Sequence, residues 1–228
     1  MIRNRIAAAA VVVAAGAFMF ADQSGVFAGD GALKGLFGTA QAQTPEAPVA
    51  YPAPLDEATL ERLLAGTDID PALVLRICTD GPGREANFGW AQSQTLIDLG
   101  WSHAFNERGP EALGAFIAAL HVGPDRPEPY WGMGIAAYVA GLDDAVIDAC
   151  FARTIAMLPD VAPVYADYGN VLSLRERWDD AIAAYEQALA LDDGFIHAHD
   201  GLSNALLAIG DRDGALAHHN RSMELRGH

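Results

Sequence analysis

The stretch Arg175–Asp193, RERWDDAIAAYEQALALDD, decides the fold, because its small and large residues recur at helical spacing. Ala181, Tyr185 and Ala188 are four and three residues apart, so they share one face of a helix. Two methyl-sized side chains beside a ring predict a neighbouring helix that approaches closely and leaves a slot for Tyr185. We expect Gly169, on the preceding helix of the same pair, to face the two alanines, with an interaxial distance near the lower end of about 8–10 Å.

The same pattern recurs along the chain at a spacing of about 34 residues. Shifting the sequence by this amount aligns Ala162–Phe195 with the segment that starts at Ile196, and a similar block spans Ser93–Arg126. The matched positions are Gly169 with Ser203, Leu172 with Leu206, and Ala181 with Ala215, while the earlier block places Leu99, Gly100, Ala112, Phe116, Ala119 and Pro124 at the same intervals. A helix-turn-helix unit with this pattern resembles the tetratricopeptide repeat (TPR) family.

The resemblance implies an all-α fold, a right-handed superhelix of stacked helix pairs. Four units are expected, over residues 93–126, 128–161, 162–195 and 196–228. The second unit allows two registers. One gives the large-residue and Pro places to Trp131, Tyr138, Phe151 and Pro159, and the other gives the small-residue places to Gly134, Ala145 and Ala152. Tyr185 is expected to point at the following unit, toward residues such as Leu202 and Leu206.

The residues before the repeats divide into three predicted segments. An apolar run behind two arginines, Ile6–Phe20, would form a helix of about 22 Å, shorter than a bilayer core of roughly 30 Å. Residues 1–28 therefore predict a signal peptide of an exported, periplasmic protein, with cleavage after residue 28 or 42; an uncleaved inner-membrane anchor is the alternative. Residues 29–54 form a Pro- and Ala-rich linker, and residues 55–92 are expected to form a helical cap at the amino end of the array.

The balance of charges limits the classes of partner. Asp and Glu number 30 against 14 Lys and Arg, which gives a formal net charge of −16. Such a chain would be repelled by the phosphates of nucleic acid and by anionic lipid, so neither is an expected partner. A basic segment of another protein is compatible with this charge.

The two cysteines and the histidines are the candidate residues for a disulfide or a metal site. Cys78 and Cys150 lie in apolar helical stretches, where an unpaired Cys behaves as a small hydrophobe, and we expect them to be unpaired although an oxidising compartment would allow a disulfide. The sequence has no G-x-S-x-G, Walker, H-E-x-x-H or CxxC motif, so neither catalysis nor a cofactor is expected. Four histidines in the last unit, His197, His199, His218 and His219, lack i, i+4 spacing, and no metal site is predicted.

The concave surface of the superhelix is the expected binding site, because stacked first helices line it. The residue after each Gly place is predicted to lie there: Trp101, then Ile135 or Ala136, then Asn170 and Asn204. Relatives that hold peptide ends use Asn in this way and add Lys or Arg for a terminal carboxylate. Here the corresponding places hold Ala166, Asp167, Asp200 and Gly201, so a carboxylate clamp is not expected.

These observations predict a groove with an apolar end and an acidic, amide-rich end. The apolar end is Ile97, Trp101 and Met133, and the other end is Asp167, Asn170, Asp200 and Asn204. The expected function is a non-enzymatic scaffold of the bacterial cell envelope that holds an apolar or basic segment of another envelope protein. The alternative is a periplasmic repeat protein that binds a small ligand or a metal.

Overall fold

The computed structural model describes residues 57–67, 69–81 and 90–227. The predicted export segment and the Pro-rich linker, residues 1–28 and 29–54, lie outside this range. Within it the chain is all-α, as predicted, and no described helix has the length and apolar character needed to cross a membrane. The ten helices of the described part are α3 (Glu57–Leu64), α4 (Pro71–Asp80), α5 (Trp90–Phe105), α6 (Gly109–Val122), α7 (Glu128–Val139), α8 (Asp144–Met157), α9 (Ala162–Leu174), α10 (Trp178–Leu191), α11 (Ile196–Ile209) and α12 (Arg212–Arg226).

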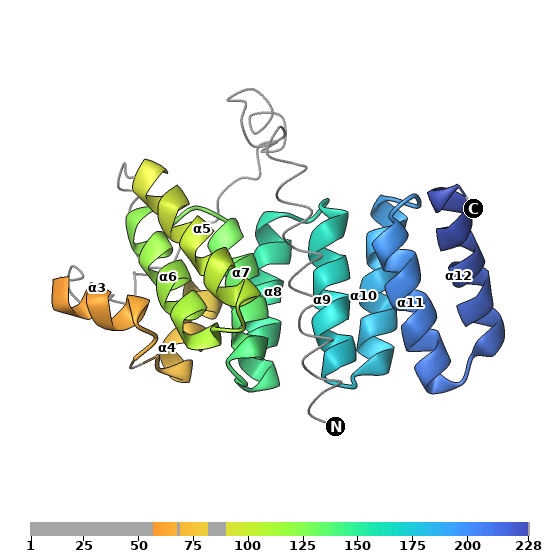
Figure 1. Cartoon of the computed structure of the whole chain (residues 1–228), viewed down its shortest axis with the longest axis horizontal. Helices are drawn as coiled ribbons and strands as arrows, with labels where there is room; N and C mark the ends of the chain where they lie inside the picture. Colours follow the sequence, from red (N-terminus) through yellow and green to blue (C-terminus); the bar gives the residue numbers. More distant parts are fainter. Residues whose placement is uncertain (1–56, 68, 82–89, 228) are drawn as a thin grey trace.

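Helices α5 to α12 pack in four consecutive pairs that follow one another in a row (Figure 1). Successive first helices also touch: α5 contacts α7, α7 contacts α9, and α9 contacts α11. Successive second helices make at most marginal contacts with one another in the described part of the chain. The row is therefore tighter on the side of the first helices, and we call this side the inner face.

The turn inside each pair contains one residue in the left-handed region. These residues are Glu107, Gly141, Glu176 and Gly210, with φ of 57°, 74°, 61° and 91°. Each lies seven positions after the small residue of its first helix, so the four first helices share one register. Glycine is favoured at such an angle, and the two glutamates adopt it because the pair geometry requires a sharp reversal.

The second pair resolves the ambiguity of register. Gly134 of α7 takes the same place as Gly169, whereas Phe151 of α8 takes the place of Tyr185. Each of the two registers thus holds for one helix of the pair. The reason is one additional residue between Gly141 and the ring of Phe151, in the turn that leads into α8.

Two of the aromatic rings that point between pairs lie between two glycines, one from the first helix of their own pair and one from the first helix of the next pair. A Cβ added to Gly169 would lie 2.7 Å from the Tyr185 ring, and one added to Gly201 of the next pair would lie 2.4 Å from it. Phe116 is enclosed in the same way by Gly100 and Gly132. The prediction that Gly169 faces Ala181 and Ala188 is therefore wrong: it faces the ring, and the ring reaches the next unit by lying on Gly201.

Replacing Gly169 with Ala should lower the free energy of unfolding by about 1–3 kcal/mol, although Ala is the better helix former by about 1 kcal/mol. The new methyl would overlap the Tyr185 ring, which cannot retreat because Gly201 lies against its other side. Denaturant unfolding measures the change. Gly194→Ala is the control, since a Cβ there meets only an Asp192 side-chain oxygen at 3.3 Å. Equal unfolding midpoints for Gly169→Ala and wild type would refute this packing.

Helices α3 and α4 lie over second helices, since α3 packs on α6 and α4 packs on α8. The α3–α6 contact is close, because a Cβ at Gly114 would lie 1.6 Å from the Leu63 carbonyl oxygen. Cys78 of α4 is bonded to Cys150 of α8, and both are buried. The expectation of unpaired cysteines is therefore wrong, because the chain brings α4 back onto α8.

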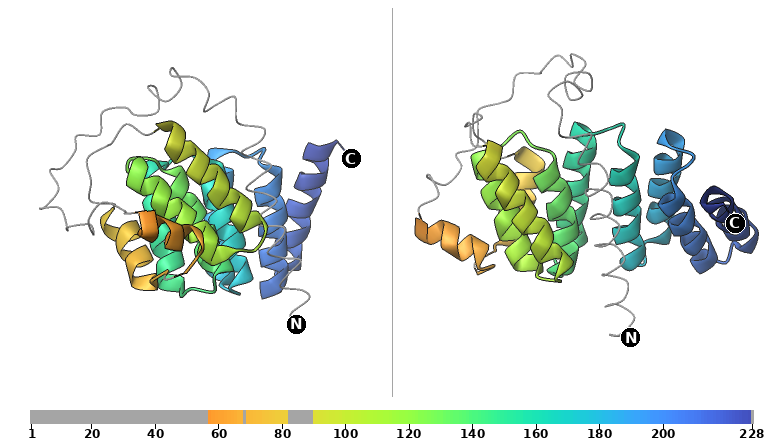
Figure 2. Two further views of the ribbon diagram at one scale, coloured as in Figure 1. Left: turned by 60° about the vertical axis from the view of Figure 1, so that its left-hand side comes forward. Right: turned by 45° about the horizontal axis from the view of Figure 1, so that its top comes forward.

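Two hydrophobic clusters form the core, and they meet at α9. The first cluster extends from Leu63 to Val171, and the second contains residues of α9, α10 and α11. Helix α9 contributes Val164 and Val171 to the first cluster and Ala166 and Leu172 to the second. Figure 2 shows the pairs from two further directions, with α11 and α12 at the end of the row.

Candidate functional site

The predicted apolar end of the site lies in the interior. Ile97 and Met133 have no exposed surface, and Trp101 is 6% exposed. The Trp101 ring meets Phe116 and Trp131 edge-on, with ring centroids 5.5 and 6.3 Å apart. Ile97, Trp101 and Met133 therefore pack between α5 and α7 and do not present an apolar surface to a partner.

Asp167 also lies in the interior, at 1% exposure. Its Oδ2 accepts a hydrogen bond of 3.1 Å from the Trp131 indole N–H, and its Oδ1 accepts a long one of 3.5 Å from the Asn170 amide. Burial raises the pKa of the carboxyl group to about 7, and these two hydrogen bonds offset only part of that effect. Asp167 links α7 to α9 and is not available to a partner.

Asn170 is half-buried and part of the same network. Its side-chain oxygen accepts a 2.8 Å hydrogen bond from the Tyr185 hydroxyl, which also lies 3.3 Å from the Ser173 hydroxyl. Burial raises the pKa of Tyr185. The amide therefore fixes the ring that joins two pairs. This role leaves only its N–H₂ group, held loosely by Asp167, for another partner.

At the end of the row, Asp200 and Asn204 of α11 differ in their surroundings. Asp200 is half-buried, accepts a 2.5 Å hydrogen bond from the Ser222 hydroxyl, and forms an ion pair with Arg226 of α12. Burial works to raise the pKa of Asp200, but the hydrogen bonds from Arg226 and Ser222 outweigh it and lower the pKa. Asn204 is exposed, and its side chain makes no hydrogen bond to the described part of the chain.

Asn204 belongs to an exposed stripe on α11. His197, Asn204 and Leu207 are exposed, and their spacing of seven and three residues places them on one face of the helix with Asp200 between. Leu207 is 58% exposed, so its apolar side chain is accessible beside the Asn204 amide. We call His197, Asp200, Asn204 and Leu207 the α11 stripe.

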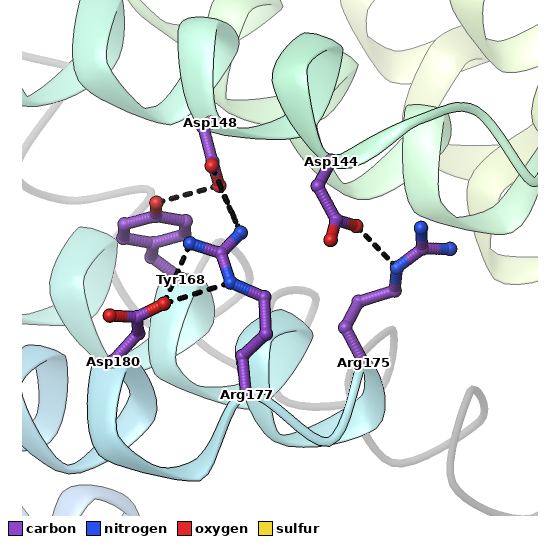
Figure 3. Close-up of polar contacts among 6 residues, drawn as sticks. All are labelled: Asp144, Asp148, Tyr168, Arg175, Arg177 and Asp180. Atoms are coloured by element: carbon purple, nitrogen blue, oxygen red, sulfur yellow. Dashed lines mark hydrogen bonds and ion pairs between the residues drawn. The ribbon is translucent and has the colours of Figure 1, made fainter.

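A polar cluster that we did not predict joins the second pair to the third (Figure 3). Arg177 holds both oxygens of Asp148 at 2.8 and 2.9 Å and contacts Asp180, while the Tyr168 hydroxyl donates to Asp148 at 2.8 Å. Arg175 pairs with Asp144 at 2.5 Å. The two arginines come from the α9–α10 turn, and Asp144 and Asp148 come from α8. Two stretches of the sequence carry this signal: RER at residues 175–177, in the α9–α10 turn, and DDAVID at residues 143–148, at the start of α8.

The described residues do not form a group of three or more His, Cys, Asp or Glu side chains that could hold a metal ion. Of the four histidines of the last unit, His199 and His218 meet across α11 and α12, whereas His197 and His219 are exposed. The arrangement of the described side chains thus offers contact surfaces and internal polar networks. It brings Asp167 and Asn170 together on α9, whereas Trp101 lies on α5 and the α11 stripe lies on α11.

Comparison with known proteins agrees with this architecture. The model of the tetratricopeptide repeat matches residues 168–195, which cover the second half of α9 and all of α10. A crystal structure of MamA protein aligns with a TM-score of 0.51 at 27% identity, covering 59% of this chain and 73% of that chain. A second MamA crystal structure aligns with a TM-score of 0.52 at 22% identity, covering 75% of this chain and 91% of that chain. A structure of MamA residues 41 to the end from Desulfovibrio magneticus RS-1 aligns with a TM-score of 0.51 at 20% identity, covering 74% of this chain and 92% of that chain. No curated protein sequence matches the chain.

Proposed function

We propose that this chain, a TPR-like stack of helix pairs, is a non-enzymatic scaffold that holds a segment of another protein against the α11 stripe. One observation carries the proposal: an amide without an internal partner in the described chain, Asn204, lies one helical turn from the exposed Leu207. The amide can pair with both a backbone N–H and a C=O of an extended segment. Leu207 can bury an apolar side chain of the same segment.

The charge of the chain favours a basic partner segment. The formal net charge is −16, and three arginines of the last two pairs, Arg175, Arg177 and Arg226, are already paired with aspartates. A Lys or Arg on the partner would be attracted, whereas an acidic segment would be repelled. The carboxylates of Asp167 and Asp200 are engaged internally, so the attraction would come from the acidic surface as a whole.

We also propose that the protein works outside the cytoplasm, with another protein of the bacterial envelope as its partner. The arginines and apolar run at residues 1–28 favour export or an inner-membrane anchor. The buried disulfide between α4 and α8 adds support, because such bonds persist mainly in oxidising compartments. Fractionation of cells that express the full chain tests this location: recovery of the folded protein with cytoplasmic markers would refute it.

The binding surface is tested in two steps. A photo-reactive amino acid at position 204 should cross-link a partner in intact cells, and mass spectrometry identifies it. Binding of that purified partner is then measured with Leu207→Arg, which places a charge in the stripe and should weaken the affinity by about tenfold or more. Leu216→Arg is the matched control, since Leu216 is also 58% exposed but lies on α12.

The two variants separate the α11 stripe from a general effect of charge. Equal affinities of Leu207→Arg and wild type would show that the partner does not dock on the stripe. Equal losses in Leu207→Arg and Leu216→Arg would indicate that added positive charge, and not the surface, weakens binding. Both variants should keep the melting temperature of wild type, because neither side chain belongs to the core.

A further inference from the structure

His199 of α11 and His218 of α12 place two ring nitrogens directly opposite each other in the last pair. Their Nδ1 atoms are 2.9 Å apart, and their ring centroids are 5.2 Å apart with 30° between the ring planes. His199 is 6% exposed, whereas His218 is half-buried. The His199 ring is therefore buried, whereas the His218 ring that it contacts is accessible to solvent.

The surroundings of His199 fix its proton. Its Nε2 lies 3.0 Å from the backbone carbonyl oxygen of Asp193. A carbonyl oxygen can only accept, so Nε2 carries the hydrogen and the Nδ1 of the neutral ring has a free lone pair that points at His218. An imidazole that donates its other N–H to a backbone carbonyl is the usual arrangement of a metal-ligating histidine.

The spacing of the two ring centroids matches the requirement of a zinc ion, whereas the Nδ1 atoms, 2.9 Å apart, lie closer together than the ion requires. With Zn–N bonds of about 2.0–2.1 Å at a tetrahedral angle, two imidazoles have nitrogens about 3.3 Å apart and centroids about 5.2 Å apart. The centroids of His199 and His218 already have this spacing. Changes in the χ1 and χ2 torsions of the two side chains would turn the rings and open the gap between the nitrogens.

We propose that the Nδ1 atoms of His199 and His218 bind a divalent transition-metal ion, with Zn²⁺ as the ion that fits, at a site that joins α11 to α12. This site is independent of the α11 stripe and would be present whether or not a partner docks there. Because no third His, Cys, Asp or Glu of the described chain completes the group, water fills the other positions. In the absence of metal, His218 donates its Nδ1–H to His199 and the pair closes as a hydrogen bond. Zinc binding therefore requires His218 to carry its proton on Nε2.

Titration of the metal-free full chain with ZnCl₂ in a calorimeter tests the proposal. Wild type should bind one ion and show a higher melting temperature with zinc, because the ion connects the two helices of the last pair. His218→Ala should weaken binding by about tenfold or more, since one of the two protein ligands is lost. His199→Gln should do the same.

Two neighbouring histidines provide matched controls. His219 follows His218 on α12 and His197 precedes His199 on α11, and both are exposed. His219→Gln and His197→Gln should bind zinc like wild type. His218 is half-buried, so His218→Ala should fold even if His199→Gln does not, and its melting temperature without zinc verifies this. Failure of wild type to bind zinc, or unchanged binding by His218→Ala, would overturn the proposal.

Discussion

Reduction of the Cys78–Cys150 bond should lower the free energy of unfolding by about 4 kcal/mol. The bond closes a loop with a sequence separation of 72 residues, and a cross-link of this span removes much of the conformational freedom of the unfolded chain. Both sulfurs are buried between α4 and α8, so the reduced folded protein can keep the same packing. Urea unfolding of the same sample with and without a reductant measures the difference, because no atom other than the two thiol hydrogens changes.

The double variant Cys78→Ala with Cys150→Ala is the control for the reductant. It should unfold at a lower urea concentration than oxidised wild type, and its midpoint should not respond to reductant. Alkylation of unreduced, denatured wild type should label neither cysteine. Labelling of both thiols, or a midpoint of wild type that reductant leaves unchanged, would show that the bond does not form.

The disulfide illustrates what the sequence could not reveal. Cys78 and Cys150 each lie in an apolar helical stretch, and nothing in those stretches predicts that α4 folds back onto α8. The pairing follows from the path of the chain: α3 packs on α6, which directs α4 toward the next second helix. Residues 55–92, predicted as a cap at the amino end, thus contribute helices that lie over the second helices of two pairs.

The repeat itself was readable because it depends on residue size. The recurrence of a small residue on the first helix and an aromatic ring on the second predicted the pairs, and the structure places Gly100 with Phe116 and Gly169 with Tyr185. The sequence did not show which side chain of the second helix the glycine of the first helix would contact. Spacing shows that Ala181 and Tyr185 share a face, but it does not show that the glycine lies beneath the ring.

Predicting the site was harder, because exposure is set by neighbouring pairs. Trp101 and Asn170 both follow a glycine, yet Trp101 is enclosed by Phe116 and Trp131 while Asn170 is half-buried under Tyr185. Asn204 has the same place but is exposed, and α11, unlike α7 and α9, contacts no later first helix among those described. The pattern therefore identified equivalent positions on the first helices, whereas the exposure and the partners of each side chain came only from the packing.

Replacing Asp167 with Asn should raise the free energy of unfolding by about 2–4 kcal/mol at about pH 8. The carboxyl group is buried, and burial raises its pKa from 3.8 to about 7. At alkaline pH the folded protein must therefore hold an ionised group where the neutral form is favoured. Asparagine has nearly the same shape and keeps an oxygen for the Trp131 N–H, but it cannot be charged.

The sign of the pH dependence follows from the raised pKa. Below about pH 4 the carboxyl group is protonated in both the folded and the unfolded chain, and its ionisation does not affect stability. Between about pH 4 and pH 7 the unfolded chain loses this proton while the folded chain keeps it, so wild type loses stability as the pH rises. Above about pH 7 the folded group is ionised too, and the loss is complete. The advantage of Asp167→Asn should therefore be absent near pH 4 and reach its maximum above pH 7.

The lower part of the expected range allows for the Asn170 contact. The Asn170 amide N–H₂ lies 3.5 Å from the Asp167 Oδ1, and an amide N–H₂ at that position would lose this long hydrogen bond. Urea unfolding of wild type and Asp167→Asn at several pH values measures the difference, and the titration of the other carboxylates cancels between the two proteins. Asp160→Asn, at an exposed position, is the control and should change stability little at any pH. A destabilised Asp167→Asn at alkaline pH would mean that the charge of Asp167 supports the contact between α7 and α9 and does not weaken it.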